Sequence, residues 1–275
     1  MTFKKWLKTP KAYVAFAMIV YLLIASIGYK NALGIKNGLV AVIASVIVDI
    51  FMNMIKKRKW TIPDGAIITG LIISLILSTA TSLAVIAGTA VIAILSKHII
   101  VYKKKPIFNP AAFGLLLSVL IFQTGQSWWG AFGDLPAWTI LFLLIGGYLL
   151  TNRINKFVQV FTFLGTSFLL LVLMAHFNIG DAMDAFRPPF INATLFFGFF
   201  MLTDPPTSPG KNGDQLIFGL LTAAIGTIIY ALFGGLIYLF IGLCFGNLYS
   251  YLKKRSTSKV ALSRSSMKKT QRSLS

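Results

Sequence analysis

Residues 39–70 read LVAVIASVIVDIFMNMIKKRKWTIPDGAIITG, and this stretch decides the fold class. Its first 17 residues are mostly apolar, with Asp49 as the only charged side chain, and they end at the basic run 56–59. A second apolar segment begins after Pro63. A membrane span takes about 20 mostly apolar residues, and Lys and Arg gather in cytoplasmic loops. The stretch therefore predicts a membrane span, a short cytoplasmic loop and the start of another span.

The composition of the whole chain agrees with this interpretation. Of its 275 residues, 56% are hydrophobic and 12% are charged, and the mean hydropathy is +0.79. Soluble domains carry about 25% charged residues, so an ordinary water-soluble enzyme is excluded. All seven acidic residues are Asp. The single cysteine, Cys244, excludes an internal disulfide, a Cys-ligated iron–sulfur cluster and a Cys-rich zinc site.

Apolar segments recur along the chain and predict an all-α polytopic membrane protein with about ten transmembrane helices. Residues 1–11 are then a cytoplasmic N-terminal segment, 12–123 and 136–251 are two five-span halves, and 252–275 form a basic cytoplasmic tail. The tail is Ser-rich and poor in aromatic residues, so we expect disorder there. The ten segments are 12–29, 34–55, 64–79, 81–100, 107–123, 136–150, 156–176, 190–203, 214–230 and 232–251.

The distribution of basic residues predicts the orientation of these spans. With a cytoplasmic N-terminus, 23 of the 26 Lys and Arg residues fall on the cytoplasmic side, and only Lys30, Lys36 and Arg187 fall outside. This bias predicts a multi-pass protein with both termini inside. The membrane is expected to be the plasma membrane of a bacterium. The net charge of +19 then reports topology and contact with anionic lipid rather than nucleic-acid binding. Trp128 and Trp129 are expected at the outer interface.

The third and eighth segments are short and similar. Residues 62–70 (IPDGAIITG) and 190–198 (FINATLFFG) each place a polar residue before Ala and a later Gly. Short segments at matching places in two halves predict an inverted repeat with a site near the bilayer midplane. Simple packing of small residues between helices would produce the same pattern.

Two helix starts contain candidate ligand-binding residues. Asp64 precedes Gly65 and Thr69 and is placed to cap its helix, and Asn109 precedes Pro110 at another favoured helix start. Capping alone would explain both patterns. A ligand site at a helix N-terminus within the bilayer would explain them equally well.

The stretch 201–209 (MLTDPPTSP) is the most unusual segment. Its three prolines end the preceding span abruptly. Asp204 then lies at a helix C-terminus, where the helix dipole disfavours negative charge. We expect it to need a cation, a backbone donor or a ligand, unless the segment is only a polar turn.

Asp49 is the candidate for ion coupling, because an ionisable residue within an apolar span is a functional hypothesis by default. It is placed equally well to face the basic run 56–59. The two histidines, His98 and His176, fall at opposite membrane faces and cannot share one haem iron. No catalytic or metal-ligand constellation stands out.

Three blocks in order resemble the family that contains the RnfD component of Rnf electron-transport complexes and the NqrB component of the sodium-pumping NADH:quinone oxidoreductase. They are 64–78 (DGAIITGLIISLILS), 104–114 (KKPIFNPAAFG) and 197–209 (FGFFMLTDPPTSP), followed by GLLT at 219–222. The resemblance implies ten spans in two inverted halves, similar to urea transporters. It also implies a flavin-bearing, non-catalytic subunit that helps pass electrons through the membrane, coupled to Na⁺ or H⁺ movement.

The chain departs from the family at one point. Members with covalent FMN attach it to a Thr in a Ser-Gly-Ala-Thr-like segment between spans 5 and 6. Residues 123–134 here read QTGQSWWGAFGD, with Thr124 as the only Thr and no such motif. We therefore expect non-covalent FMN or riboflavin rather than a covalent flavin.

Several polar residues are predicted to line one pocket on the inner side. Helix N-termini would favour an anionic group there, such as the phosphate of FMN. The partners expected are the lipid bilayer and other membrane subunits or a flavoprotein. The alternatives are a transporter or channel for a small solute, which includes flavin, and a structural subunit without a ligand. The predicted pocket residues are Asp64, Gly65, Thr69, Asn109, Thr203, Asp204, Thr207 and Ser208.

Overall fold

The computed structural model describes residues 6–274, and it describes the side chains of residues 6–258. Each predicted apolar segment contains one helix. The helices are α2 (Pro10–Gly28), α3 (Leu33–Ile55), α4 (Asp64–Ile76), α5 (Leu83–Ile99), α6 (Pro110–Phe122), α7 (Ile140–Ile154), α8 (Phe157–His176), α9 (Phe190–Phe196), α10 (Asn212–Phe233) and α11 (Ile237–Leu274). A hairpin of β1 (Val101–Tyr102) and β2 (Lys105–Pro106) joins α5 to α6. Shorter turns are η1 (Trp129–Ala131), η2 (Ala137–Thr139), η3 (Ala182–Phe186) and the π-helical turn η4 (Phe197–Met201).

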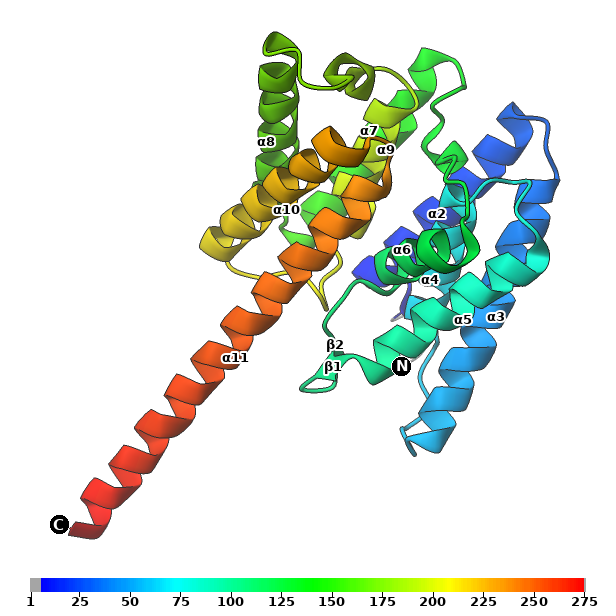
Figure 1. The fold of residues 1–275 in the computed structure, drawn as a ribbon. Coiled ribbons are helices and arrows are strands. Elements are labelled where there is room, and N and C mark those ends of the chain that lie inside the picture. Colours follow the sequence, from blue (N-terminus) through cyan, green and yellow to red (C-terminus); the bar gives the residue numbers. More distant parts are fainter. Residues whose placement is uncertain (1–5, 275) are drawn as a thin grey trace.

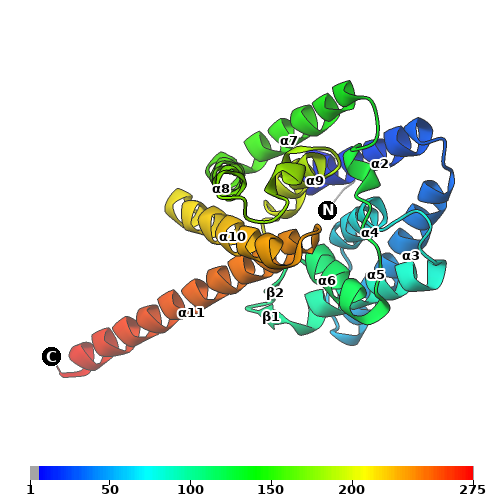
Figure 2. The same ribbon diagram turned by 45° about the horizontal axis from the view of Figure 1, so that its top comes forward.

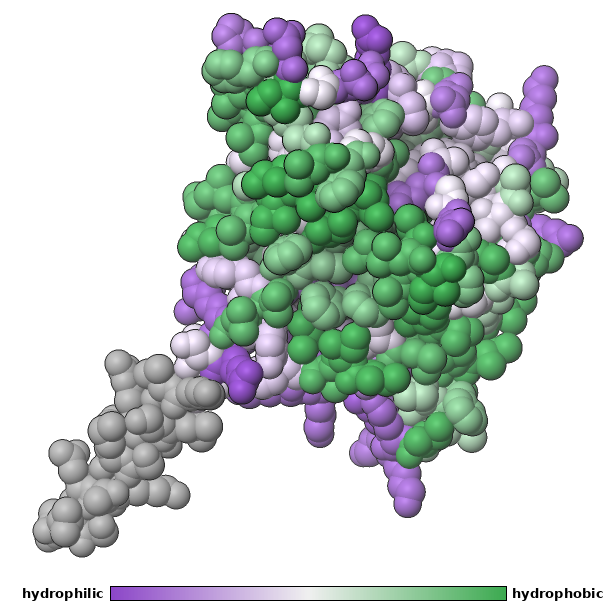
Figure 3. Space-filling view, in the orientation of Figure 1, coloured by the Kyte–Doolittle hydropathy of each residue, from purple (hydrophilic) through white to green (hydrophobic). Residues whose placement is uncertain are grey.

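The chain is a helical membrane protein. Among the described residues, five helices are long and apolar enough to cross a bilayer: α2, α3, α8, α10 and the continuous stretch Ala137–Ile154. The helices α4, α5, α6 and α9 with η4 are apolar but shorter. Large apolar side chains face outward, such as Phe16, Ile47, Phe161 and Leu232, each more than 60% exposed. Figure 3 shows hydrophobic residues across the middle of one face and hydrophilic residues toward its two ends, as a bilayer requires.

The helices form two groups that meet along the centre of the molecule. In both ribbon views α2, α3 and α5 lie on one side and α8, α10 and α11 on the other (Figures 1 and 2). Within the first group α2 packs on α4 and α3 on α5, and within the second α7 packs on α9 and α8 on α10. The contacts of α2 with α7 and of α6 with α11 join the groups.

The short helix α4 ends inside the protein, and a non-helical segment completes its hydrogen bonds. Leu77 is extended, and the carbonyl of Ile76 accepts bonds from the backbone N–H groups of Ser127 and Trp128, at 2.9 and 3.1 Å. The last carbonyls of a helix lack intrahelical partners, and in an apolar medium they need other donors. The segment near 127 supplies them.

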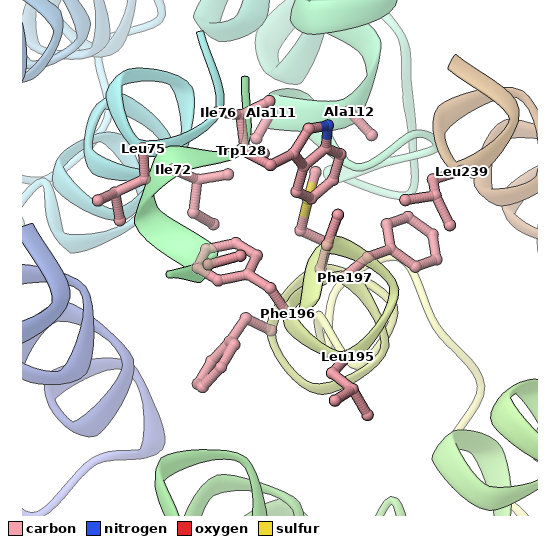
Figure 4. Packing of buried hydrophobic residues seen from close by; sticks show 14 of the residues in the cluster. Ile72, Leu75, Ile76, Ala111, Ala112, Trp128, Leu195, Phe196, Phe197 and Leu239 are labelled. Atoms are coloured by element: carbon pink, nitrogen blue, oxygen red, sulfur yellow. The ribbon is translucent and has the colours of Figure 1, made fainter. Parts of the chain in front are cut away.

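Trp128 and Trp129 are part of the core, and the expectation that they lie at the membrane interface is wrong. Their exposed fractions are 1% and 5%. Trp128 stacks on Phe240 at 5.5 Å and meets Phe196 edge-on at 6.1 Å. Figure 4 shows Trp128 and Phe196 between the ends of α4, α6 and α9. The two rings fill the space that the short helix α4 leaves open.

The last helix, α11, continues through the segment that was expected to be disordered. It runs to Leu274 and extends away from the helix groups in Figure 1. The physical reason is the composition of residues 252–275, which contain no Pro or Gly to end a helix. The side chains after residue 258 lie outside the described part.

Candidate functional site

A cavity of about 430 Å³ lies where the two groups of helices meet. This volume is within the usual range of small-molecule sites, about 300–1,000 Å³. Its walls come from α2, α4, the end of α5, the β hairpin, α6, the end of α7 and the loop after η4. The polar and charged residues that line it are Lys11, Thr69, Lys97, Lys104, Lys105, Asn109, Thr203 and Asp204.

Five of the eight predicted site residues meet in this cavity. Gly65, Thr69, Asn109, Thr203 and Asp204 all line it, although they come from three separate sequence blocks. Their proximity follows from the fold, since the starts of α4 and α6 and the end of η4 lie at the same end of the helices.

The other three predicted residues do not line the cavity. Asp64 is the first residue of α4 rather than its side-chain cap, and its carboxylate accepts bonds from the Gly65 N–H and from Lys11 Nζ, both at 2.7 Å. Thr207 lines a neighbouring cleft. The Ser208 hydroxyl donates to the carbonyl of Asp204 at 2.8 Å and accepts from Lys156 Nζ at 2.9 Å. These contacts give Asp64 and Ser208 structural partners.

Asn109 holds three elements together at the cavity wall. Its Oδ1 accepts from the Ala112 N–H at 3.1 Å, which confirms the predicted cap of α6. Its Nδ2 donates to the carbonyl of Met201 at 3.1 Å, and its backbone N–H donates to Asn247 Oδ1 at 2.9 Å. Because these groups are engaged, we assign Asn109 the role of positioning α6 against η4 and α11.

Asp204 has one side-chain partner among the described residues. Its Oδ2 accepts from the Thr207 hydroxyl at 2.9 Å. Burial raises the pKa of Asp204, while the Thr207 bond and the charges of Lys11, Lys97 and Lys156 act in the opposite direction. The side-chain partner of Asp204 is therefore the neutral hydroxyl of Thr207. The three lysines act on the carboxylate through their charges.

The cavity is electropositive. Among the described residues, four lysines (Lys11, Lys97, Lys104 and Lys105) and Asp204 line it. Lys11 and Lys97 are paired with Asp64 and Asp49, so Lys104 and Lys105 supply the excess charge. Gly65 lets Lys97 approach the start of α4, because a Cβ at that position would lie 3.3 Å from Lys97 Nζ. The N-terminal residues of α4 and α6 add the positive ends of two helix dipoles. This arrangement suits an anionic ligand.

Asp49 belongs to a buried cluster behind Lys97. Its Oδ1 lies 2.8 Å from both Lys97 Nζ and His98 Nε2, and its Oδ2 accepts from Asn53 at 3.3 Å. Lys56, from the basic run, bonds the carbonyl of His98 instead. Among the described residues, the side-chain partners of Asp49 therefore come from the end of α5 and from Asn53, and Lys56 reaches the same end of α5 through the His98 carbonyl.

Sequence reasoning missed most of the basic residues of the site. The distribution of basic residues places Lys97, Lys104 and Lys105 on the cytoplasmic side without indicating a site, and His98 stands out only as a histidine that cannot share a haem with His176. The VYKKKP run that forms the hairpin is too short to give a strand pattern. Its position in block 104–114, directly before Asn109, was the only available signal.

Comparison with known proteins supports the family assignment. No curated protein matches the chain. Residues 124–238 match the model of the NQR2, RnfD, RnfE family. The matched stretch contains the blocks 197–209 and 219–222, whereas 64–78 and 104–114 precede it. Over residues 124–238 the chain is similar to this family, which confirms the predicted resemblance to the RnfD and NqrB components.

Proposed function

We propose that this protein is an integral membrane subunit of an Rnf- or Nqr-type electron-transport system and that it holds a flavin non-covalently in the electropositive cavity. The observation that carries the proposal is the convergence of Gly65, Thr69, Asn109, Thr203 and Asp204 on one cavity. They come from the same three sequence blocks on which the family resemblance rests. Membrane partners or a flavoprotein would complete the electron path.

The packing of the helices supports two inverted five-span halves. The pairs α2–α4 and α3–α5 in the first half correspond in order to α7–α9 and α8–α10 in the second. The short helices α4 and α9 hold the same place in each series. Ten spans require the shorter helices to cross with their extended flanks, as broken helices do around the substrate sites of transporters.

The residues of the cavity fit a phosphorylated flavin. Lys11, Lys97, Lys104 and Lys105 would hold its phosphate together with the N-terminus of α4, because ammonium groups and helix N-termini both favour phosphate. Phe200 and Ile72 provide apolar wall for a ring system. A bound flavin would supply one- and two-electron chemistry. Asp204, with its raised pKa, would exchange a proton with the cavity.

Lys97 connects the cavity to the ion-coupling candidate. It lines the cavity and also contacts Asp49 at 2.8 Å. A change of charge in the cavity would alter how strongly Lys97 binds Asp49. Movement of Na⁺ or H⁺ coupled to redox change would use this contact.

The first test is an absorption spectrum of the detergent-purified protein from about 300 to 600 nm, before and after acid precipitation. We expect flavin bands that leave with the supernatant. Bands that stay with the pellet would mean a covalent flavin, with Thr124 as the first candidate for attachment. Protein that has no flavin bands and does not take up added FMN would contradict flavin binding.

Matched variants of neighbouring lysines locate the site. Lys104→Gln removes a cavity charge, whereas Lys103→Gln changes the adjacent hairpin residue, which does not line the cavity. We expect Lys104→Gln to weaken FMN binding about tenfold, because a hydrogen bond to a charged group contributes about 1.5–3 kcal/mol. Riboflavin, which lacks the phosphate, should bind both variants equally. Equal weakening of FMN binding by both changes would argue against this location.

The same cavity also suits transport of a small anionic solute. The observation in favour is its place between two helix groups that each contain a short helix. This alternative predicts saturable uptake into proteoliposomes that is lost in Asp204→Ala. Uptake equal to that of empty liposomes would exclude it.

A further inference from the structure

A second cleft of about 680 Å³ lies on the other side of the Pro205-Pro206 loop. The β hairpin, residues 206–211, the start of α10 and the α11 segment 247–258 form its walls. Tyr102 and Tyr251 meet edge-on at 5.2 Å within it. The cleft shares Lys105, Pro106 and Pro206 with the first cavity, but its other lining residues have no part in the proposed flavin site.

The cleft carries a large excess of positive charge. Its charged lining residues are Lys103, Lys105, Lys211, Lys253, Lys254 and Asp214. Lys253 forms an ion pair with Asp214, and Lys103 donates to the Ser258 hydroxyl at 2.6 Å. No salt bridge within residues 6–258 involves the other cleft lysines. Burial and the charge of Lys105 lower the pKa of Lys254.

A buried hydroxyl in the wall of the cleft lacks a partner. Ser250 is 3% exposed, and its Oγ makes no hydrogen bond within the described residues. An unsatisfied buried hydroxyl costs about 1–3 kcal/mol, so such groups normally have a partner. Ser250 is one of the lining residues of the cleft, so a rotation of its side chain about χ1 would let the hydroxyl bond a ligand oxygen there. This observation is independent of the lysines.

We propose that this cleft binds the phosphate group of a phosphorylated ligand, either the headgroup of an anionic lipid or a soluble phosphate ester. Lys211 and Lys254 would supply the charge, and Ser250 would supply a hydrogen bond. Lysine is a common phosphate ligand, and the cleft has the size of a small-molecule site. The proposal does not depend on flavin binding in the first cavity.

The test has two arms that distinguish the sources of phosphate. Native mass spectrometry of the protein in detergent compares retention of phosphatidylglycerol with that of phosphatidylcholine. Isothermal titration calorimetry measures binding of inorganic pyrophosphate to the delipidated protein. Preferential retention of phosphatidylglycerol indicates a lipid headgroup, and pyrophosphate binding indicates a soluble phosphate ester. Binding in neither arm would overturn the proposal.

Three variants locate the binding in the cleft. We expect the double change Lys211→Gln/Lys254→Gln to weaken binding about tenfold, and Ser250→Ala to weaken it less without lowering thermal stability. Lys104→Gln is the control, because it changes the first cavity alone. Lys105 is left intact because it lines both spaces. Unchanged binding in the double variant, or an equal loss in Lys104→Gln, would refute the assignment.

Discussion

Asp49 and Asp204 are two carboxylates on which the charge of Lys97 acts, and they differ in how they are compensated. Asp49 contacts Lys97, His98 and Asn53 through both of its oxygens. Within the described part of the chain, Asp204 receives one side-chain hydrogen bond, from the neutral hydroxyl of Thr207. Lys97 acts on Asp204 only through its charge, which lowers the pKa of that carboxyl.

The difference separates a carboxylate whose charge is balanced by residues of the fold from one that lines the cavity with a single neutral partner. The partners of Asp49 connect α3 to the end of α5, so its charge is balanced before any ligand arrives. Asp204 faces a cavity with excess positive charge and little direct compensation. A partly buried carboxylate whose side-chain partner is a neutral hydroxyl is costly to ionise, and such sites are where ligands and protons act.

The largest expected effect is the loss of the Asp49 cluster. Asp49→Ala would leave Lys97 and His98 without their carboxylate, and removal of one partner of a buried ion pair costs about 3–5 kcal/mol. Asp204→Ala removes one neutral hydrogen bond, which contributes about 0.5–1.5 kcal/mol. Thermal unfolding of the detergent-purified variants measures both. A loss of thermal stability in Asp204→Ala as large as that in Asp49→Ala would contradict the comparison.

A second substitution separates charge from packing at Asp49. In the double variant Asp49→Ala/Lys97→Met the uncompensated ammonium is gone. We expect part of the lost stability to return, because residues in one ion-pair cluster are not additive. Additive losses in the double variant would mean that the effect of Asp49→Ala is one of packing alone.

Lys156 is a cation near Asp204, and the hydrogen-bond partners of Lys156 are neutral. It extends the comparison to a group of the opposite charge. It lies between α7 and α8 and donates to Ser208 Oγ, to Gln159 Oε1 and to the carbonyl of Pro209. Burial lowers its pKa to about 8. Between about pH 8 and the ordinary lysine pKa of about 10.4, the unfolded chain binds more protons than the folded protein, so stability rises with pH.

We therefore expect the wild type to gain stability relative to Lys156→Gln as the pH rises through this interval. The gain is on the order of 3 kcal/mol, because the two pKa values differ by about 2.4 and one unit of difference corresponds to about 1.4 kcal/mol. Chemical denaturation at several pH values measures it. A stability difference that does not change with pH would show that Lys156 has an ordinary pKa in the folded protein.

The helices and part of the cavity are predictable from the sequence because they depend on local patterns. Each apolar segment contains a helix, and Asn109 with Pro110 marks the start of α6. The Gly65, Asn109 and Asp204 blocks fall at helix ends on the same side. Because successive spans run in opposite directions, the sequence alone predicts that these three blocks lie on one side of the membrane.

The partners of Asp49 were not predictable, because they depend on how two helices are rotated. Lys97 and His98 are 48 and 49 residues away in the chain, and both were placed at the inner end of the fourth segment. Only the packing of α3 against α5 turns them toward Asp49. The burial of Trp128 likewise depends on the space beside the short helix α4, which no local rule describes.

The smallest expected effect is the pH dependence that Asp204 contributes. Because burial raises its pKa in the folded protein, the folded state binds more protons than the unfolded chain above the ordinary Asp pKa of about 3.9. Stability is therefore lost as the pH rises from this value through the folded pKa. Asp204→Asn lacks this loss, so its advantage over the wild type should grow with pH and then level off.

The effect is small because Asp204 is partly exposed to the cavity. Thermal unfolding from about pH 4 to 7 measures it. With FMN added at the higher pH values, the profile of stability against pH for Asp204→Asn should stay parallel to its ligand-free profile. The wild-type profile should change slope with FMN if ligand binding alters the protonation of Asp204. Parallel wild-type and Asp204→Asn profiles without ligand would show that Asp204 is already compensated, and the contrast with Asp49 would then disappear.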